Sequence, residues 1–301
     1  MTAEPLKILL LGGTGQVGRE LRRRPWPMPV ALAAPGRDEI DLADPHALRA
    51  AVARHAPAIL VNAAAFTAVD AAETDPAAAH AVNAAAPSIL AAAAAKAGAA
   101  ILHLSTDYVF DGRKPGPYVE DDPVAPLSVY GSTKAAGEAA VRAACPRHVI
   151  LRTSWVYAPA GRNFVLTMLR LGAERPLLRI VDDQRGAPTA AADIADTIMA
   201  IARQIAVDED SWGTFHFTAA GATSWYGFAR AIFALAAAAG RPVPHLEPVT
   251  TADYPTPARR PSNSRLDCAR IGRAYGIVPR DWQAALADTT AELFARGDGG
   301  T

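Results

Sequence analysis

Near its amino terminus the sequence reads KILLLGGTGQVG, from Lys7 to Gly18. The apolar run at 7–12 predicts a buried strand, and the residues from about 16 to 24 predict the helix that follows it. Gly12 and Gly15 lie at the turn between the two, and Gly18 lies where the helix opens. Glycine lets backbone amides approach a pyrophosphate closely, and the amino terminus of a helix favours its negative charge. This strand, turn and helix predict a dinucleotide-binding fold.

Strands and helices continue to alternate through the first half of the chain. Strands are predicted at 30–33, 59–62, 101–105 and 149–153, and helices at 84–97 and 129–143. Another helix is predicted to start at Asp44-Pro45, where the aspartate side chain can cap it and the proline needs no acceptor. The alternation predicts an α/β fold of the Rossmann type, with a doubly wound parallel sheet covered by helices on both faces.

The pattern loosens after Tyr157. Loop sequences at 182–189 and 250–267 alternate with predicted helices at 190–206 and 224–239. We expect a dinucleotide-binding Rossmann domain at 1–157 that carries the catalytic residues. Residues 158–301 are expected to form mainly a smaller mixed α/β lobe for substrate, with some segments returning to the first domain. Ligands of open α/β sheets bind at the carboxyl edge of the strands, where this lobe would close.

Composition restricts the partners of the protein. The 301 residues include 30 basic and 30 acidic side chains, so no net charge favours nucleic acid or an anionic membrane. Cys145 and Cys268 lack metal-site spacing and are predicted to be reduced thiols. The amino terminus is too short and too acidic for a signal peptide, and Pro87 and Lys96 interrupt the longest apolar stretch. We therefore expect a cytoplasmic protein without nucleic-acid or membrane partners.

The second predicted strand bears on the choice of cofactor. Enzymes that use NAD commonly carry an acidic residue at its end, which binds the ribose. Here the strand ends in alanines, and Arg37 follows after Gly36. A guanidinium at this place could bind a 2′-phosphate, which favours NADPH over NADH. The alternative is an ordinary solvated loop arginine.

A tyrosine and a lysine provide the candidate chemistry. Tyr130 and Lys134 are four residues apart, so on a helix they share one face. A nearby cation lowers the pKa of a phenol, which lets tyrosine act as an acid near neutral pH. Ser105 or Thr106, at the end of the fourth strand, could bind a substrate carbonyl beside the tyrosine. Both could equally be strand-end caps, and Asp107 could be a turn residue.

Together these segments resemble the extended short-chain dehydrogenase/reductase superfamily. More narrowly, the chain resembles the dTDP-4-dehydrorhamnose reductase family almost from end to end. The segments that carry this resemblance are NAAAFTAVD (62–70), STDYVF (105–110), YGSTK (130–134), RTSWVY (152–157), DQRGAPT (183–189), PTPARRP (255–261) and DWQ (281–283).

The resemblance implies an oxidoreductase that uses NADPH, with NADH possible. It would reduce the C4 keto group of dTDP-4-dehydro-L-rhamnose to give dTDP-L-rhamnose for polysaccharide biosynthesis. Tyr130 would be the proton donor, Lys134 would tune its pKa and hold the cofactor ribose, and Thr106 would support the same network. Thr106, Asp107, Trp155, Arg259 and Arg260 would contact the dTDP-sugar. The cofactor, which Tyr130 and Lys134 also touch, would be lined by Gly12, Gly15, Gln16, Val17, Gly18, Arg37, Asp41, Leu42, Ala65, Phe66 and Thr67.

One departure from the family concerns metal. Magnesium-bridged dimers of this family use three glutamates, at positions that here hold Glu20, Ala192 and Glu292. Alanine cannot ligate a cation, so we expect no magnesium or other metal site, and a monomer or a differently built homodimer.

Two other functions remain open at this point. One is a nucleotide-sugar epimerase or dehydratase, although dehydratases place an Asp-Glu pair where this chain has Asp107-Tyr108. The other is a non-catalytic NADP-binding subunit resembling the beta subunit of methionine adenosyltransferase.

Overall fold

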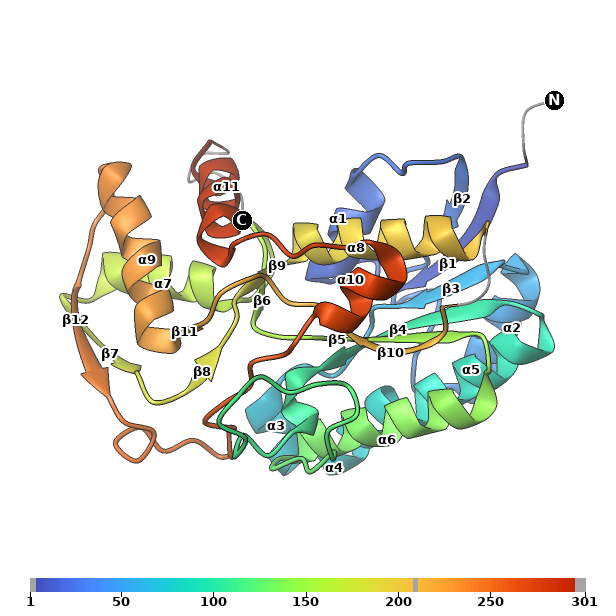
Figure 1. Cartoon of the computed structure of the whole chain (residues 1–301), viewed down its shortest axis with the longest axis horizontal. Coiled ribbons are helices and arrows are strands. Elements are labelled where there is room, and N and C mark those ends of the chain that lie inside the picture. The colour runs from blue at the N-terminus through green and yellow to red at the C-terminus, as the bar shows by residue number, and fades with distance from the viewer. Residues whose placement is uncertain (1–3, 208–210, 296–301) are drawn as a thin grey trace.

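A six-stranded parallel sheet forms the centre of the larger lobe (Figure 1). The computed structural model describes residues 4–207 and 211–295. The strand order is β10-β5-β4-β3-β1-β2. The strands are β1 (Leu6–Leu11), β2 (Val30–Ala33), β3 (Ile59–Asn62), β4 (Ala100–Thr106), β5 (His148–Thr153) and β10 (Gly213–His216). Because all neighbouring pairs are parallel, the carboxyl ends of β1, β3 and β4 meet at one edge.

Helices cover both faces of this sheet, as Figure 1 shows. Ile8 and Leu10 of β1 face one hydrophobic core, whereas Leu9 and Leu11 face the other, as the alternation of a strand requires. The first face is covered by α1 (Gln16–Arg23), α8 (Ala191–Ile205) and α10 (Ala269–Tyr275). The second is covered by α2 (Pro45–His55), α5 (Ala86–Lys96) and α6 (Val129–Ala144). The predicted fold class is confirmed. Asp44 caps α2 as predicted, accepting a hydrogen bond from the amide of His46.

The connection from β3 to β4 contains more helix than the pattern predicted. It contains α3 (Val69–Thr74), α4 (Pro76–His80) and a π-helical turn at Ala81–Ala85 before α5. The helical run Pro76–Lys96 is long and apolar enough to cross a membrane by length and composition alone. Its most apolar window is 44% buried within the fold, and α5 packs on α2 and α6. It is therefore a core helix of the sheet domain.

The smaller lobe packs helices against short sheets. It contains α7 (Phe164–Glu174), α9 (Trp225–Ala238) and α11 (Trp282–Ala295), with β7 (Leu177–Val181) paired to β12 (His245–Val249). Two further pairs join β6 (Val156–Tyr157) to β9 (Thr189–Ala190) and β8 (Arg185–Gly186) to β11 (Thr223–Ser224). Tyr157, Phe228 and Trp282 lie in its core. The chain crosses between lobes repeatedly, since α8, β10 and α10 belong to the sheet domain.

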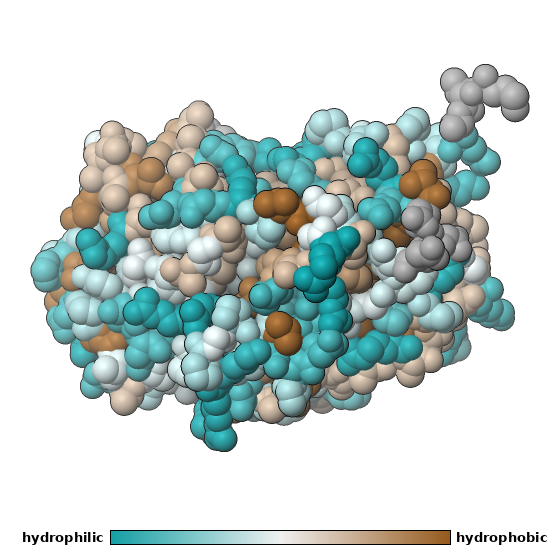
Figure 2. Space-filling model, viewed as in Figure 1, coloured by the Kyte–Doolittle hydropathy of each residue, from teal (hydrophilic) through white to brown (hydrophobic). Residues whose placement is uncertain are grey.

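Apolar residues are dispersed on the face seen in Figure 2, where small brown patches are separated by polar side chains. The large apolar side chains that the described residues expose, such as Val207 and Val278, come from several separate segments of the chain. Isolated exposed apolar residues are ordinary on a protein surface. Figure 2 thus shows no large continuous apolar patch on this face.

Candidate active site

The glycine turn after β1 has a geometry that only glycine can adopt. Gly12 has a φ of +83°, and a Cβ added to it would lie 2.6 Å from the amide nitrogen of Ala64. A Cβ on Gly18 would lie 2.1 Å from the carbonyl oxygen of Gly12. Gly15 caps α1 without a side-chain hydrogen bond, which leaves the first-turn amides of Gln16 and Val17 without side-chain partners from the cap. This cradle fits a pyrophosphate group at the helix terminus.

The side chain of Gln16 connects the cradle to the smaller lobe. Its Oε1 accepts a hydrogen bond of 2.9 Å from Asn163, the residue that caps α7. Asn163 also donates to the carbonyl of Ala158, at 2.9 Å. The two lobes are thus bonded at the rim of the expected cofactor site.

The loop after β3 is fixed by a residue that the sequence did not single out. Asn83, in the π-helical turn, accepts from the amide of Phe66 at 2.8 Å and donates to its carbonyl at 3.0 Å. Its amide also lies 3.2 Å from the hydroxyl of Thr133 on α6. Asn83 therefore holds Ala65, Phe66 and Thr67 at the carboxyl edge of the sheet. A π-helical turn often marks a functional position, and a buried asparagine within an alanine run was the available signal.

The loop after β2 presents the residues expected to bind the adenosine end of the cofactor. Arg37 is exposed in a turn, and Leu42 packs against the apolar core beneath the loop. The carboxylate of Asp41 accepts from the amide of Ala43, at 2.9 Å. Because β2 ends at Ala33 without an acid, the arginine is the charged group available for a 2′-phosphate.

The candidate catalytic residues converge where β4 ends and α6 begins. Thr106 is the last residue of β4, and Tyr130 lies in the first turn of α6, which Ser128 caps. A Cβ on Gly131 would lie 2.2 Å from the carbonyl oxygen of Tyr108, so glycine lets the helix start pack directly on the segment after β4. Burial raises the pKa of Tyr130 to about 12, although its hydrogen bond to the Thr106 hydroxyl opposes this shift.

Lys134 lies one turn further along the same face of α6. Its side chain is 2% exposed, and Nζ donates a 2.7 Å hydrogen bond to the carbonyl of Leu104. Burial lowers the pKa of Lys134 to about 8, whereas Glu138, one turn further on, raises it. Lys134 therefore supplies a positive charge one helical turn from Tyr130, and this charge is lost when the lysine deprotonates at moderately alkaline pH.

A buried ion pair holds α6 in this position. Arg152 of β5 contacts Glu138 with Nε and Nη2, at 2.8 and 2.7 Å, and both side chains are almost completely buried. Arg152 also lies 3.3 Å from His216 of β10. Breaking a buried pair of this kind typically costs about 3–5 kcal/mol. The sequence did not identify Glu138 or Arg152, because their pairing joins segments that are not adjacent in the chain.

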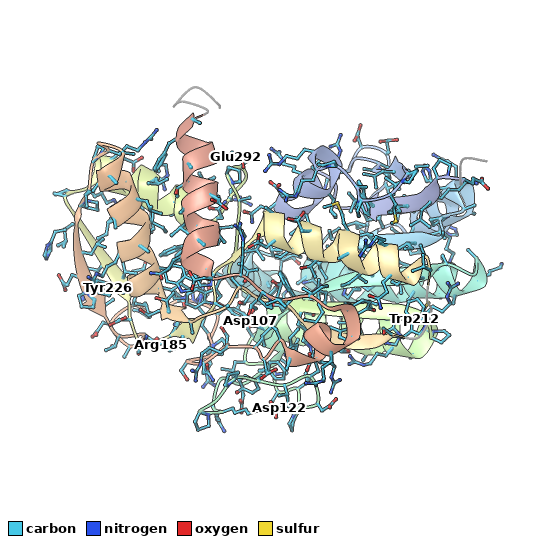
Figure 3. The ribbon with its side chains drawn as sticks, turned by 45° about the horizontal axis from the view of Figure 1, so that its top comes forward. Asp107, Asp122, Arg185, Trp212, Tyr226 and Glu292 are labelled. Carbon is cyan, nitrogen blue, oxygen red and sulfur yellow. The ribbon has the colours of Figure 1, made fainter. Side chains whose placement is uncertain are left out.

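Asp107 follows Thr106 and lies where the sheet meets the smaller lobe (Figure 3). It is 2% exposed, and Oδ1 accepts a 2.9 Å hydrogen bond from the Thr106 hydroxyl. Oδ2 has no partner at ordinary hydrogen-bond distance within 4–207 and 211–295, although the Ser264 side chain lies near enough to lower the pKa of the carboxyl group. Burial raises the pKa of Asp107 to about 7.

Trp155 adopts an unusual backbone conformation opposite this site. Its φ is +48°, and its indole stacks on Trp225 with a centroid distance of 3.6 Å. A Cβ on Gly186 would lie 2.4 Å from the Trp155 ring, so glycine is required on the other side. A non-glycine residue at positive φ persists only where its surroundings enforce it. Packing of the smaller lobe thus fixes the expected sugar-contacting residue.

The two arginines expected to bind the substrate diphosphate differ in their surroundings. Arg260 forms a bidentate pair with Asp70 of α3, with its shorter contact at 2.8 Å. Arg259 is exposed and forms no ion pair within the described part of the chain. The structure places Arg260 as an anchor of the 255–261 loop and leaves Arg259 free to meet an anion.

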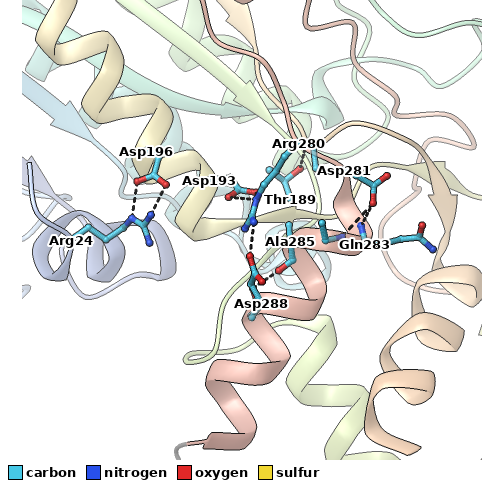
Figure 4. Close-up of polar contacts among 12 residues, drawn as sticks. Arg24, Thr189, Asp193, Asp196, Arg280, Asp281, Gln283, Ala285 and Asp288 are labelled. Carbon is cyan, nitrogen blue, oxygen red and sulfur yellow. Dashed lines mark hydrogen bonds and ion pairs between the residues drawn. The ribbon is translucent and has the colours of Figure 1, made fainter. Parts of the chain in front are cut away.

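At the positions linked to a metal in the family, an arginine forms ion pairs with the two glutamates. Arg23 contacts Glu20 at 2.7 Å and Glu292 at 2.8 Å, beside Ala192 in a hollow of about 350 Å³. Figure 4 shows the neighbouring pairs, Arg24 with Asp196, and Arg280 with Asp193 and Asp288. Among the residues that the structure describes, no cluster of three side chains could hold a metal ion. The absence of a metal requirement stays a prediction.

A glycine cradle after the first strand, and a tyrosine and lysine on the helix beside β4, define a nucleotide-dependent oxidoreductase of the short-chain dehydrogenase/reductase superfamily. The family model for the RmlD substrate binding domain matches residues 6–294. The dTDP-4-dehydrorhamnose reductase of Escherichia coli K12 is 44% identical over 96% of this chain and 98% of its own length.

Two further relatives indicate the range of the family. A crystal structure of dTDP-4-dehydrorhamnose reductase from Bacillus anthracis, in complex with NADP, has a TM-score of 0.88 and 32% identity, covering 96% of this chain and all of that one. A probable dTDP-4,6-dihydroxy-2-methyloxan-3-one 4-ketoreductase from Streptomyces antibioticus is 44% identical, covering 96% of each chain. The chain belongs to the dTDP-4-dehydrorhamnose reductase family, as its sequence predicted.

Proposed function

We propose that this protein reduces the C4 keto group of dTDP-4-dehydro-L-rhamnose to dTDP-L-rhamnose with NADPH, as a cytoplasmic enzyme. The observation that carries the proposal is the placement of Tyr130 over a buried lysine at the sheet edge that the glycine cradle also reaches. The cofactor would supply hydride to C4. The alkoxide that develops at O4 then needs a proton, and Tyr130 is the donor.

The surrounding residues support this step in separate ways. The charge of Lys134 favours the tyrosinate that remains after proton transfer, and Thr106 orients the phenol through its hydrogen bond. Asp107 offers a carboxylate oxygen to a sugar hydroxyl, while Trp155, stacked on Trp225 and only partly exposed, contacts the sugar with the part of its indole that remains accessible. Arg259 offers charge to the diphosphate of the substrate.

Loss of NADPH absorbance on addition of the keto-sugar nucleotide tests the proposal directly. Tyr130→Phe should reduce kcat by about 10²–10⁴ because it removes a general acid, while the dissociation constant of NADPH changes little, since the aromatic ring beside the cofactor is kept. Lys134→Met should lower kcat and also weaken NADPH binding, since it removes the cation beside Tyr130 and the ribose contact together. A Tyr130→Phe enzyme with near wild-type kcat, under conditions where chemistry limits the rate, would show that Tyr130 is not the acid.

A different 4-keto sugar is the second candidate substrate. The relative from Streptomyces antibioticus acts, by its name, on another dTDP-linked ketone, and it is as similar to this chain as the Escherichia coli reductase. Comparing kcat/KM for the two ketones decides between them. Binding of NADPH without turnover of either ketone would instead favour a regulatory subunit.

A further inference from the structure

A buried histidine lies directly beneath the catalytic lysine. His103, in the middle of β4, is 0% exposed. Its Nε2 lies 3.4 Å from Nζ of Lys134, and its Nδ1 lies 3.1 Å from Nδ2 of Asn62 on β3. The three side chains thus form a continuous row from the sheet interior to the active site. Neither His103 nor Asn62 has a role in the chemistry described above.

Asn62 determines which nitrogen of His103 carries the proton. The orientation of its amide is fixed, because Oδ1 accepts a 3.2 Å hydrogen bond from the amide of Ala64. Its Nδ2 therefore faces His103, and an amide nitrogen can donate but not accept. Nδ1 of His103 must be the acceptor. Burial and the nearby lysine lower the pKa of His103 well below its ordinary value, so the ring is neutral and its single proton lies on Nε2.

The proton on Nε2 points at Lys134. A neutral amine can accept a hydrogen bond from it, whereas an ammonium group presents only hydrogens. The carbonyl of Leu104, at 2.7 Å, accepts a hydrogen from Nζ in either form of the lysine. The imidazole N–H therefore disfavours the charged form of Lys134, beyond the effect of burial alone.

We propose that Asn62 and His103 are positioning residues that set the proton affinity of Lys134 by holding His103 in its Nε2–H tautomer. The consequence for catalysis rests on the proposed function. Lys134 activates Tyr130 only while it is charged, so this pair sets the pH at which activity is lost on the alkaline side. Because burial lowers the pKa of Lys134 to about 8, the charge is present below that pH and is lost as pH rises through it.

The other charged groups around Lys134 do not depend on this tautomer. Glu138 and Tyr130 face it from α6, and Arg152 of β5 pairs with Glu138. That ion pair is the same in every variant described below. Asn62→Asp also adds a carboxylate beside His103, and that charge by itself raises the pKa of Lys134, so the tautomer of His103 must be measured together with the lysine titration.

Exchanging Asn62 for aspartate should invert the tautomer. A carboxylate can accept from the amide of Ala64 with one oxygen and from Nδ1–H of His103 with the other. Nε2 then becomes an acceptor for the Lys134 ammonium, and the pKa of Lys134 should rise by about one unit or more. His103→Gln is the matched control, because its amide can accept from Asn62 and still present an N–H to Nζ. It should keep the wild-type pKa to within a few tenths of a unit.

Two NMR measurements on the full chain without substrate test this. The chain has four lysines, Lys7, Lys96, Lys114 and Lys134, so a ¹³Cε-lysine titration resolves Lys134 directly. Imidazole ¹⁵N shifts identify the tautomer of His103, whose signals are assigned by their loss in His103→Gln. We expect Nε2–H in the wild type and Nδ1–H in Asn62→Asp, with the higher lysine pKa.

A wild-type Nδ1–H tautomer would overturn the proposal, as would an unchanged lysine pKa after the tautomer has inverted. If Asn62→Asp does not fold, the wild-type tautomer still decides, because an Nδ1–H ring would leave Nε2 as an acceptor for the Lys134 ammonium. In the reductase assay, the alkaline limb of kcat should move with the NMR pKa while KM for NADPH changes little. A wild-type chain with these NMR properties but no turnover of the ketone would refute the proposed function alone.

Discussion

Asp107→Asn should make the protein more stable at alkaline pH than at acidic pH, relative to the wild type. The carboxyl group is buried, and the hydrogen bonds from Ser264 and Thr106 do not offset the loss of hydration, so the fold favours its neutral form. Burial raises the pKa of Asp107 from 3.8 to about 7. A carboxyl pKa that is higher in the folded state than in the unfolded state lowers stability as pH rises between the two values.

The pH-dependent part of this effect can be calculated. Between about pH 5.5 and pH 7 the unfolded state is already ionised while the folded state still holds its proton, and each pH unit costs about 1.4 kcal/mol of stability. The interval of about 1.5 units gives about 2 kcal/mol, and above pH 7 the cost is constant. An asparagine does not titrate. The free energy of burying its amide is the same at both pH values, so it cancels when the change in relative stability between them is taken.

Urea unfolding of both proteins at about pH 5.5 and pH 8.5 measures this difference. The stability of the variant relative to wild type should increase by about 2 kcal/mol from the lower to the higher pH. Asp253→Asn is the control, because the pKa of that exposed carboxylate lies below 3.8 and both states are ionised throughout. If the stability of Asp107→Asn relative to wild type changed as little with pH as that of Asp253→Asn, burial would not raise the pKa of Asp107 as argued.

Three further predictions concern the cofactor and assembly. Arg37→Ala should raise KM for NADPH and leave NADH nearly unchanged, and an equal loss with both would show that Arg37 does not bind the 2′-phosphate. Gly12→Ala should abolish NADPH binding in a calorimetric titration, whereas Gly98→Ala, at a φ of +68° with no atom within 4 Å, should retain it. Light scattering should give the same mass with and without EDTA, since Arg23 already neutralises Glu20 and Glu292; dissociation on chelation would contradict this.

The cradle and the tyrosine–lysine pair could be predicted because their signals are local. Gly12 and Gly18 lie six residues apart on one turn, and Tyr130 and Lys134 lie one helical turn apart, so spacing alone relates them. The strands at 30–33 and 59–62 match the structure in both bounds, because each is a short apolar run between clear turn residues. The division of the chain at 157 stays a prediction.

The supporting contacts could not be predicted, because they join segments that only the fold brings together. Asn83 and Phe66 are 17 residues apart, and Asp70 and Arg260 are 190 apart. In the sequence, Asn83, Asp70 and Arg260 look like ordinary polar residues of a loop or of an exposed helix face. The structure changes the expectation for Arg260 in particular, since a guanidinium engaged by a carboxylate has less freedom to bind a diphosphate than exposed Arg259.

The protein buries charged groups in two different ways. Some form an ion pair that supports the fold, and others have no partner of opposite charge and lie at the candidate active site. The charges of Arg152 and Glu138 neutralise each other in a bidentate ion pair. The pair therefore stabilises the position of α6 and leaves neither charge without a partner. Lys134 and Asp107 are equally buried but have no partner of opposite charge in direct contact, and their pKa values move toward neutrality in opposite directions. A fold tolerates such uncompensated groups at a cost in stability where they exchange protons or meet a ligand. Because both lie within one turn of Thr106 or Tyr130, that cost is concentrated at the carboxyl edge of β4, which is where a keto group would have to be held and protonated.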